Sequence, residues 1–131
     1  MSFSAISLLR LGTAHPDLQR VCNRALLTVN FSVLCGHRGQ EDQDRAFAEG
    51  KSKVQWPHGE HNATPSRAVD LAPIPLDWNN RASFVDLACH ILAAANEEGV
   101  QIRWGGDWNR NGRMEDERFV DLPHFELWGE A

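Results

Sequence analysis

Five side chains that could hold a metal ion or move a proton lie in two distant parts of the sequence. His58 and His61 fall in a polar stretch, Asp70 follows inside an apolar run, and Asp121 and His124 lie near the C-terminal end. An unpaired carboxylate is costly to bury, so Asp70 predicts a cationic partner. Two imidazoles and one carboxylate leave a fourth position open for water, as at catalytic zinc. The spacing leaves a second interpretation open, in which Asp70 pairs with an arginine and the histidines lie on the surface.

Asp121 has the position expected of a general base. It precedes His124 by three residues, which is close enough for its carboxylate to reach a water molecule in the same site. The three cysteines, Cys22, Cys35 and Cys89, form no Cys-x-x-Cys pair and lie in apolar surroundings. We therefore expect buried thiols rather than a thiolate zinc site.

A second cation is suggested by Asp107, Asn109 and Asn111, which a glycine follows. The pattern Asp-x-Asn-x-Asn-Gly matches the first half of an EF-hand calcium loop. The twelfth position is Arg118 instead of the usual glutamate, although three acids occupy 115–117. The alternative is a plain polar turn, because Asp, Asn and Gly are also common turn residues.

Composition excludes several classes of protein. The 131 residues suffice for a single domain spanning 1–131, and the net charge of −5 argues against a nucleic-acid binder. No apolar run approaches the roughly 18 residues of a membrane span. The N-terminal stretch lacks an early cation and Arg10 interrupts it, so we expect no signal peptide, no membrane anchor and synthesis in the cytosol.

Hydrophobic spacing and turn residues predict helices alternating with short strands. Helices are expected over 16–29, 40–49 and 80–98, strands over 31–34, 68–72, 100–104 and 124–128, and long polar loops over 51–66 and 105–120. The strands are too few for a doubly wound sheet. The expected class is α+β, with helices packed on a small, mainly antiparallel sheet.

Three motifs together resemble one enzyme family. Residues 61–70, HNATPSRAVD, resemble the His…Ala-x-Asp motif of zinc D-Ala-D-Ala carboxypeptidases and phage L-alanyl-D-glutamate endopeptidases. Residues 121–126, DLPHFE, resemble their acid-x-x-His signature, and 36–43, GHRGQEDQ, resemble their Gly-x-Arg-x-x-x-x-Gln segment. The resemblance covers most of the chain and implies the fold shared with the hedgehog N-terminal domain.

The resemblance implies a zinc site and a base. His61, Asp70 and His124 would hold Zn²⁺, and Asp121 would be the catalytic base. Eight residues separate His61 from Asp70, whereas the family usually has six. His58 therefore stays open as a substitute for His61.

The resemblance also implies substrate-binding roles for Arg38 and Gln43 at a helix N-terminus. A fixed guanidinium binds a carboxylate or carbonyl of a muropeptide in two-point fashion. The structural alternative for Arg38 is a surface ion pair with Glu41 or Asp42, which contributes little.

The expected function is a zinc metallopeptidase that cuts the peptidoglycan stem peptide, at the L-Ala–D-Glu bond, as a monomeric phage endolysin. It would be made in the host cytoplasm and act on the wall in the periplasm after release, with calcium tightening its loop. The alternatives are a D-Ala-D-Ala carboxypeptidase and a non-catalytic zinc-fold binding domain. Trp56, Trp104 and Trp108 are expected near the site, and Trp78 and Trp128 in structural positions.

Overall fold

A four-stranded antiparallel sheet forms the centre of the molecule in the computed structural model, which describes residues 1–129. Its order is β1-β2-β4-β3, and each neighbouring pair is antiparallel. The bounds are Phe31–Cys35 for β1, Ala68–Pro73 for β2, Ile102–Trp104 for β3 and His124–Leu127 for β4. The sheet confirms the α+β class expected from the sequence. Within the described residues, no helix has both the length and the apolar character needed to cross a membrane.

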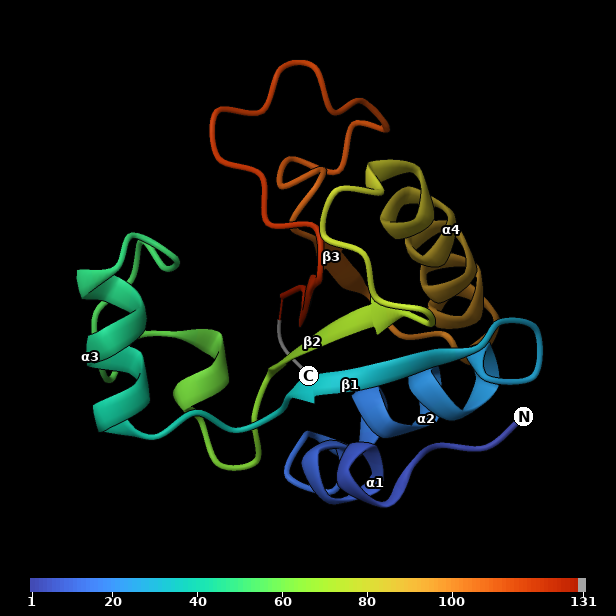
Figure 1. Cartoon of the computed structure of the whole chain (residues 1–131), viewed down its shortest axis with the longest axis horizontal. Coiled ribbons are helices and arrows are strands. Elements are labelled where there is room, and N and C mark those ends of the chain that lie inside the picture. The colour runs from blue at the N-terminus through green and yellow to red at the C-terminus, as the bar shows by residue number, and fades with distance from the viewer. Residues whose placement is uncertain (130–131) are drawn as a thin grey trace.

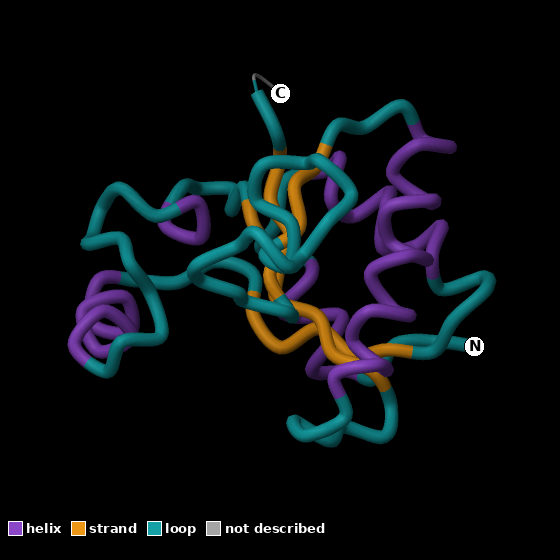
Figure 2. Tube along the Cα trace, turned by 90° about the horizontal axis from the view of Figure 1, so that it is seen from above, coloured by secondary structure: helices purple, strands orange, loops and turns teal. Residues whose placement is uncertain are grey.

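The two faces of the sheet have different neighbours. Helices α2 (Pro16–Ala25) and α4 (Arg81–Glu98) cover one face and enclose the core (Figure 1). Strand residues pointing into this core include Val69, Leu71 and Phe125, each at most 1% exposed. Figure 2 shows the sheet between these helices and an opposite side made mostly of loops. Alternation along the strands therefore sends the residues between the core positions toward the loops.

Helix α1 (Ala5–Leu11) is an element that the sequence analysis missed. It runs beside β1, an edge strand of the sheet. The Ser7 hydroxyl accepts a hydrogen bond from the backbone N–H of Val33 at 2.9 Å, and the Arg10 guanidinium donates to the Val33 carbonyl at 3.2 Å. Polar groups of α1 thus satisfy the backbone N–H and C=O of Val33 at the open edge of β1.

The loop side carries two smaller helices. Helix α3 (Gln40–Ala48) stands apart from the others in Figure 1, and the expected loop over 51–66 contains a 3₁₀ turn, η1 (Glu60–Asn62). Most predicted boundaries agree with the structure to within one or two residues. The clearest difference is α2, which ends at Ala25 where the apolar spacing had suggested continuation to Val29.

Some expectations about cysteine and tryptophan burial were wrong. Cys22 is buried as expected, but Cys35 is only partly buried and Cys89 is exposed. Trp104 lies in the core, whereas Trp78 is 61% exposed and stacks on Phe84. Residue type alone did not separate a tryptophan of the core from one on the surface.

Candidate metal centre and active site

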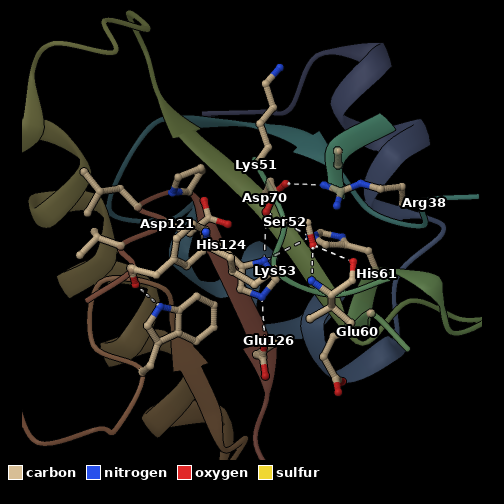
Figure 3. Close-up of a pocket in the computed structure, with 18 of the residues that line it drawn as sticks. Arg38, Lys51, Ser52, Lys53, Glu60, His61, Asp70, Asp121, His124 and Glu126 are labelled. Carbon is tan, nitrogen blue, oxygen red and sulfur yellow. Dashed lines mark hydrogen bonds and ion pairs between the residues drawn. The ribbon is translucent and has the colours of Figure 1, made fainter. Parts of the chain in front are cut away.

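Asp70 and His124 are brought together by strand register. They are direct partners in the β2–β4 ladder, so both side chains leave the same face of the sheet. His61 reaches them from η1. His61 Nε2 lies 3.1 Å from Asp70 Oδ1 and 3.2 Å from His124 Nδ1, and His124 Nδ1 lies 3.3 Å from Asp70 Oδ1 (Figure 3). Three potential ligand atoms therefore converge on one point.

The outer nitrogens of the two histidines show which atoms carry lone pairs at that point. His61 Nδ1 lies 2.7 Å from the carbonyl oxygen of Gly36, which can only accept, so Nδ1 carries the proton. His124 Nε2 lies 2.7 Å from the carboxylate of Glu126 and donates in the same way. Both inner nitrogens then present lone pairs to each other and to Asp70. A proton or a metal cation must lie between them.

The electrostatics of the cluster agree with bound positive charge. Burial lowers the pKa of His61, but the adjoining Asp70 carboxylate outweighs burial and raises it to about 10. Burial would raise the pKa of Asp70, and the two histidines reverse this and hold it well below its usual range. The site thus stabilises a cation beside a permanently ionised carboxylate.

Asp121 lies at the edge of this cluster. Oxygen and nitrogen atoms of Asp121, Asp70 and His124 lie within 4.8 Å of one another. Burial, with the nearby charge of Asp70, raises the pKa of Asp121 to about 6. Its backbone N–H donates to the Gly105 carbonyl at 2.8 Å, which ties the loop to the end of β3. A carboxyl group that titrates near neutral pH beside a water-accessible site is suited to proton transfer.

Arg38 and Gln43 lie together on the opposite side of the cluster. The Arg38 guanidinium is 3.3 Å from Asp70 Oδ2 and 3.2 Å from Gln43 Oε1. The surface pairs weighed for Arg38 instead belong to Arg45, which contacts Glu41 and Asp42. The alternative pairing of Asp70 with an arginine thus exists, but the histidines beside it are buried rather than on the surface.

Gln43 itself is 1% exposed. Its amide nitrogen donates to Ser52 Oγ at 3.0 Å and to the Val54 carbonyl at 2.6 Å, and its oxygen also accepts from Asn62 at 3.1 Å. Its polar atoms are therefore all engaged within the protein. Its oxygen thus meets the Arg38 guanidinium from a fixed position.

The cluster opens into a cavity of about 1030 Å³ between α3 and the loop that follows β3. His58 lines this cavity. Among the described residues, the groups with metal-ligating geometry contain His61 and not His58. Trp108 also lines the cavity, with its ring 5.3 Å from that of His124. Trp104, expected at the site, is instead a core residue whose indole donates to the Leu122 carbonyl at 2.7 Å.

The loop with the calcium-like pattern is held by its own polar groups. The Asp107 carboxylate accepts from the backbone N–H groups of Asn111 at 3.2 Å and Gly112 at 2.7 Å. The Asp116 carboxylate accepts from the side chains of Asn109 and Asn111, which lowers its pKa. The predicted residues Asp107, Asn109 and Asn111 are therefore brought together, with Asp116 as a fourth member.

Two charged residues at the site were not predicted, the buried Glu126 and the partly buried Arg103. Glu126, 6% exposed, contacts His124 and accepts a hydrogen bond from Arg103 at 2.7 Å. A signal was present in the sequence, since Glu126 is a charged residue inside an apolar strand, just as Asp70 is.

Comparison with known proteins places the chain in a family. The sequence model of the family described as phage L-alanyl-D-glutamate peptidase matches residues 1–128. The L-alanyl-D-glutamate peptidase of Escherichia phage T5 is 32% identical over 126 residues, covering 90% of this chain and 91% of the relative. The crystal structure of the Serratia marcescens L-Ala D-Glu endopeptidase ChiX is similar with a TM-score of 0.77 and 30% identity, covering 97% of this chain and 90% of that one. The chain is therefore a hydrolase that belongs to the phage L-alanyl-D-glutamate peptidase family.

Proposed function

We propose that the chain is a zinc-dependent endopeptidase that cleaves the L-Ala–D-Glu bond of the peptidoglycan stem peptide. The observation that carries the proposal is the convergence of three lone-pair donors at separations of 3.1, 3.2 and 3.3 Å. Ligand atoms at the corners of a tetrahedral zinc site lie about 3.3 Å apart. His61, Asp70 and His124 would hold the ion, and two nitrogens with one oxygen suit zinc better than calcium or magnesium.

The residues around the donors fit hydrolysis of an amide. When bound, zinc supplies a Lewis acid that activates water and polarises a carbonyl group. Asp121 takes a proton from the attacking water and delivers it to the leaving amine, as general base and then general acid. Burial and the Asp70 charge raise the pKa of this carboxyl group, which helps it hold the proton between the two steps.

Arg38 is proposed to orient the substrate. Its guanidinium lines the cavity and is fixed by Asp70 and Gln43. The D-glutamate residue of the stem peptide bears a free carboxylate beside the scissile amide, and an immobilised guanidinium favours such a group. In this proposal Gln43 contributes through Arg38 and does not touch the substrate.

Mass spectrometry of digested peptidoglycan tests the proposed bond. The expected products are peptides that begin with D-glutamate and glycan chains that retain L-alanine. A chelator should stop their release, and added zinc should restore it. Release of free D-alanine would identify a D-Ala-D-Ala carboxypeptidase instead. No release of either product by the zinc-loaded protein would indicate a binding domain without catalytic activity.

The biological setting proposed is host lysis by a phage. The monomer, made in the cytoplasm, would reach the wall in the periplasm after the inner membrane is breached. Gram-negative cells with a permeabilised outer membrane should therefore lose turbidity when the protein is added, and intact cells should not. Equal turbidity in permeabilised cells with and without protein would contradict a lytic role.

We further propose that Ca²⁺ binds the loop at Asp107, Asn109 and Asn111. Asp116 supports this, because its carboxylate already meets both asparagine side chains and can replace the acid missing at Arg118. Trp108, within the same loop, donates from its indole to the Phe119 carbonyl at 2.6 Å and packs on His124. If calcium orders the loop, it would therefore also fix the position of Trp108 against His124 in the active site.

A further inference from the structure

The two histidines of the metal centre are held from outside by chemically different partners. His61 donates to the backbone carbonyl of Gly36, and His124 donates to the side chain of Glu126, each at 2.7 Å. A carbonyl is a neutral acceptor, whereas an ionised carboxylate strengthens the hydrogen bond and makes the opposite imidazole nitrogen a better electron donor. The contribution of His124 to metal binding therefore depends on how Glu126 is held.

Strand register places Glu126 for this contact. It lies two residues after His124 on β4, so both side chains leave the same face of the sheet. Its ladder partner on β2 is Ala68, whose small side chain leaves room, and its partner on β3 is Arg103. The two carboxylate oxygens have different partners: Oε1 accepts from His124, and Oε2 lies 2.7 Å from the Arg103 guanidinium.

Arg103 is itself fixed by aromatic rings. Its guanidinium carbon lies 4.8 Å from the centre of the Trp128 ring and 5.3 Å from the centre of the Trp108 ring. Its Nε is buried without a hydrogen-bond partner. Stacking and the contact with Glu126, together with a 3.5 Å contact to the Trp108 carbonyl, thus hold this cation in place.

We propose that Glu126 and Arg103 are positioning residues that keep His124 in the form with its proton on Nε2, so that Nδ1 faces the metal, and that they thereby set the metal affinity. The inference rests on the proposed zinc site. Both residues line the cavity, but neither is one of the proposed metal ligands, and their role is to hold His124 in place. Trp108 and Trp128 act on His124 only indirectly, because they keep the Arg103 guanidinium directed at the Glu126 carboxylate.

The chain offers a matched control for this proposal. Arg67 and Glu60 form another arginine–glutamate pair at 3.1 Å, and Glu60 also lines the cavity, but neither has a contact with the ring of His61 or His124 among the described interactions. Three variants are compared: Glu126→Ala, the isosteric Glu126→Gln and the control Glu60→Gln. Circular dichroism confirms that each is folded before zinc is titrated against a chromophoric chelator.

We expect Glu126→Ala to weaken zinc binding by about 10- to 100-fold, the usual effect of losing an outer partner of a ligand histidine. Glu126→Gln keeps an acceptor oxygen and should lose less, and Glu60→Gln should bind zinc like the unchanged protein. If Glu126→Ala fails to fold, the comparison of zinc affinity between Glu126→Gln and Glu60→Gln decides the question. Equal zinc affinity in a folded Glu126 variant and in Glu60→Gln would overturn the inference.

A spectroscopic measurement separates positioning from simple stabilisation. In the zinc-loaded protein, nitrogen-15 spectra should show a protected Nε2 proton on His124, shifted in Glu126→Gln and unchanged in Glu60→Gln. A purely structural role would lower thermal stability equally with and without zinc and leave this signal unchanged. Failure of the unchanged protein to bind zinc would instead refute the proposed metal site, so the two failures are distinguishable.

Discussion

Two walls of the cavity are held in place by different interactions. One wall is the sheet face that carries Asp70 and His124, and the other is the loop over 107–117, which contributes Trp108. Asp70 and His124 alternate with residues of the core, since Val69, Leu71 and Phe125 beside them are each at most 1% exposed. The 107–117 loop instead depends on local hydrogen bonds among its own polar groups. Moving a ligand on the sheet would disturb the core, whereas moving the loop breaks only local polar contacts. The sheet therefore suits an ion that stays bound, and the loop suits an ion that binds and dissociates.

Replacing a proposed zinc ligand should have the largest effect. We expect His61→Ala to abolish stoichiometric zinc and with it all hydrolysis, because the remaining donors cannot close the site. His58→Ala, which changes a cavity-lining histidine outside the cluster, serves as the control. Metal analysis of both purified variants checks this. Zinc retained in His61→Ala and lost in His58→Ala would reverse the ligand assignment.

The next effect is expected where the two walls meet. Asp121→Ala should lower the rate of stem-peptide cleavage by about 10²–10⁴-fold, the usual contribution of a general acid–base group. Zinc content should stay the same, because Asp121 is not one of the proposed ligands. Product analysis by mass spectrometry on the zinc-loaded variant measures this. Cleavage at the normal rate would remove Asp121 from the mechanism.

A smaller effect is expected from calcium at the 107–117 loop. Millimolar Ca²⁺ should raise the cleavage rate about 5-fold or more, the lower end of typical couplings between two sites. Asp107→Ala removes the first carboxylate of the loop and should abolish the response of the rate to calcium. Calorimetric titration of zinc-loaded protein measures binding directly. If the titration gives no heat and calcium does not change the rate, the loop is only a polar turn.

The smallest effect should appear in calcium-free stability. Asn109→Ala should change the free energy of unfolding by no more than about 0.5 kcal/mol, as is usual for exposed positions. Phe125→Ala, on the core side of β4, should cost about 3–5 kcal/mol. Urea denaturation of both variants tests the contrast between the walls. Similar losses would mean that the loop is as deeply integrated as the sheet.

The sequence was most informative where chemistry and periodicity coincide. Asp70 inside an apolar strand predicted a cationic partner, and the family resemblance joined it to His61 and His124, which the structure brings beside it. The helix over 80–98 was also visible, because side-chain spacing and end residues agree there.

Cross-strand pairing was the main feature out of reach. Nothing in the sequence states that Arg103 lies opposite Glu126, because that depends on a register fixed by the whole core. The same applies to Gln43, whose burial results from contacts with Ser52, Val54 and Asn62. Helix α1 was missed for a different reason. It is short, and Ile6, Leu8 and Leu9 are all at least half exposed, so no apolar stripe marks it.

That short helix also has a consequence for solubility. Strand β1 ends the sheet, and an uncovered strand edge invites pairing with the same edge of another molecule. Ser7 and Arg10 occupy the N–H and C=O of Val33 that would otherwise be available for such pairing. Trimming the first dozen residues to obtain a smaller enzyme would therefore remove none of the proposed catalytic groups and yet leave the backbone groups of Val33 open at the sheet edge and remove Phe3 and Leu11 from the core. The cost would appear as aggregation during production.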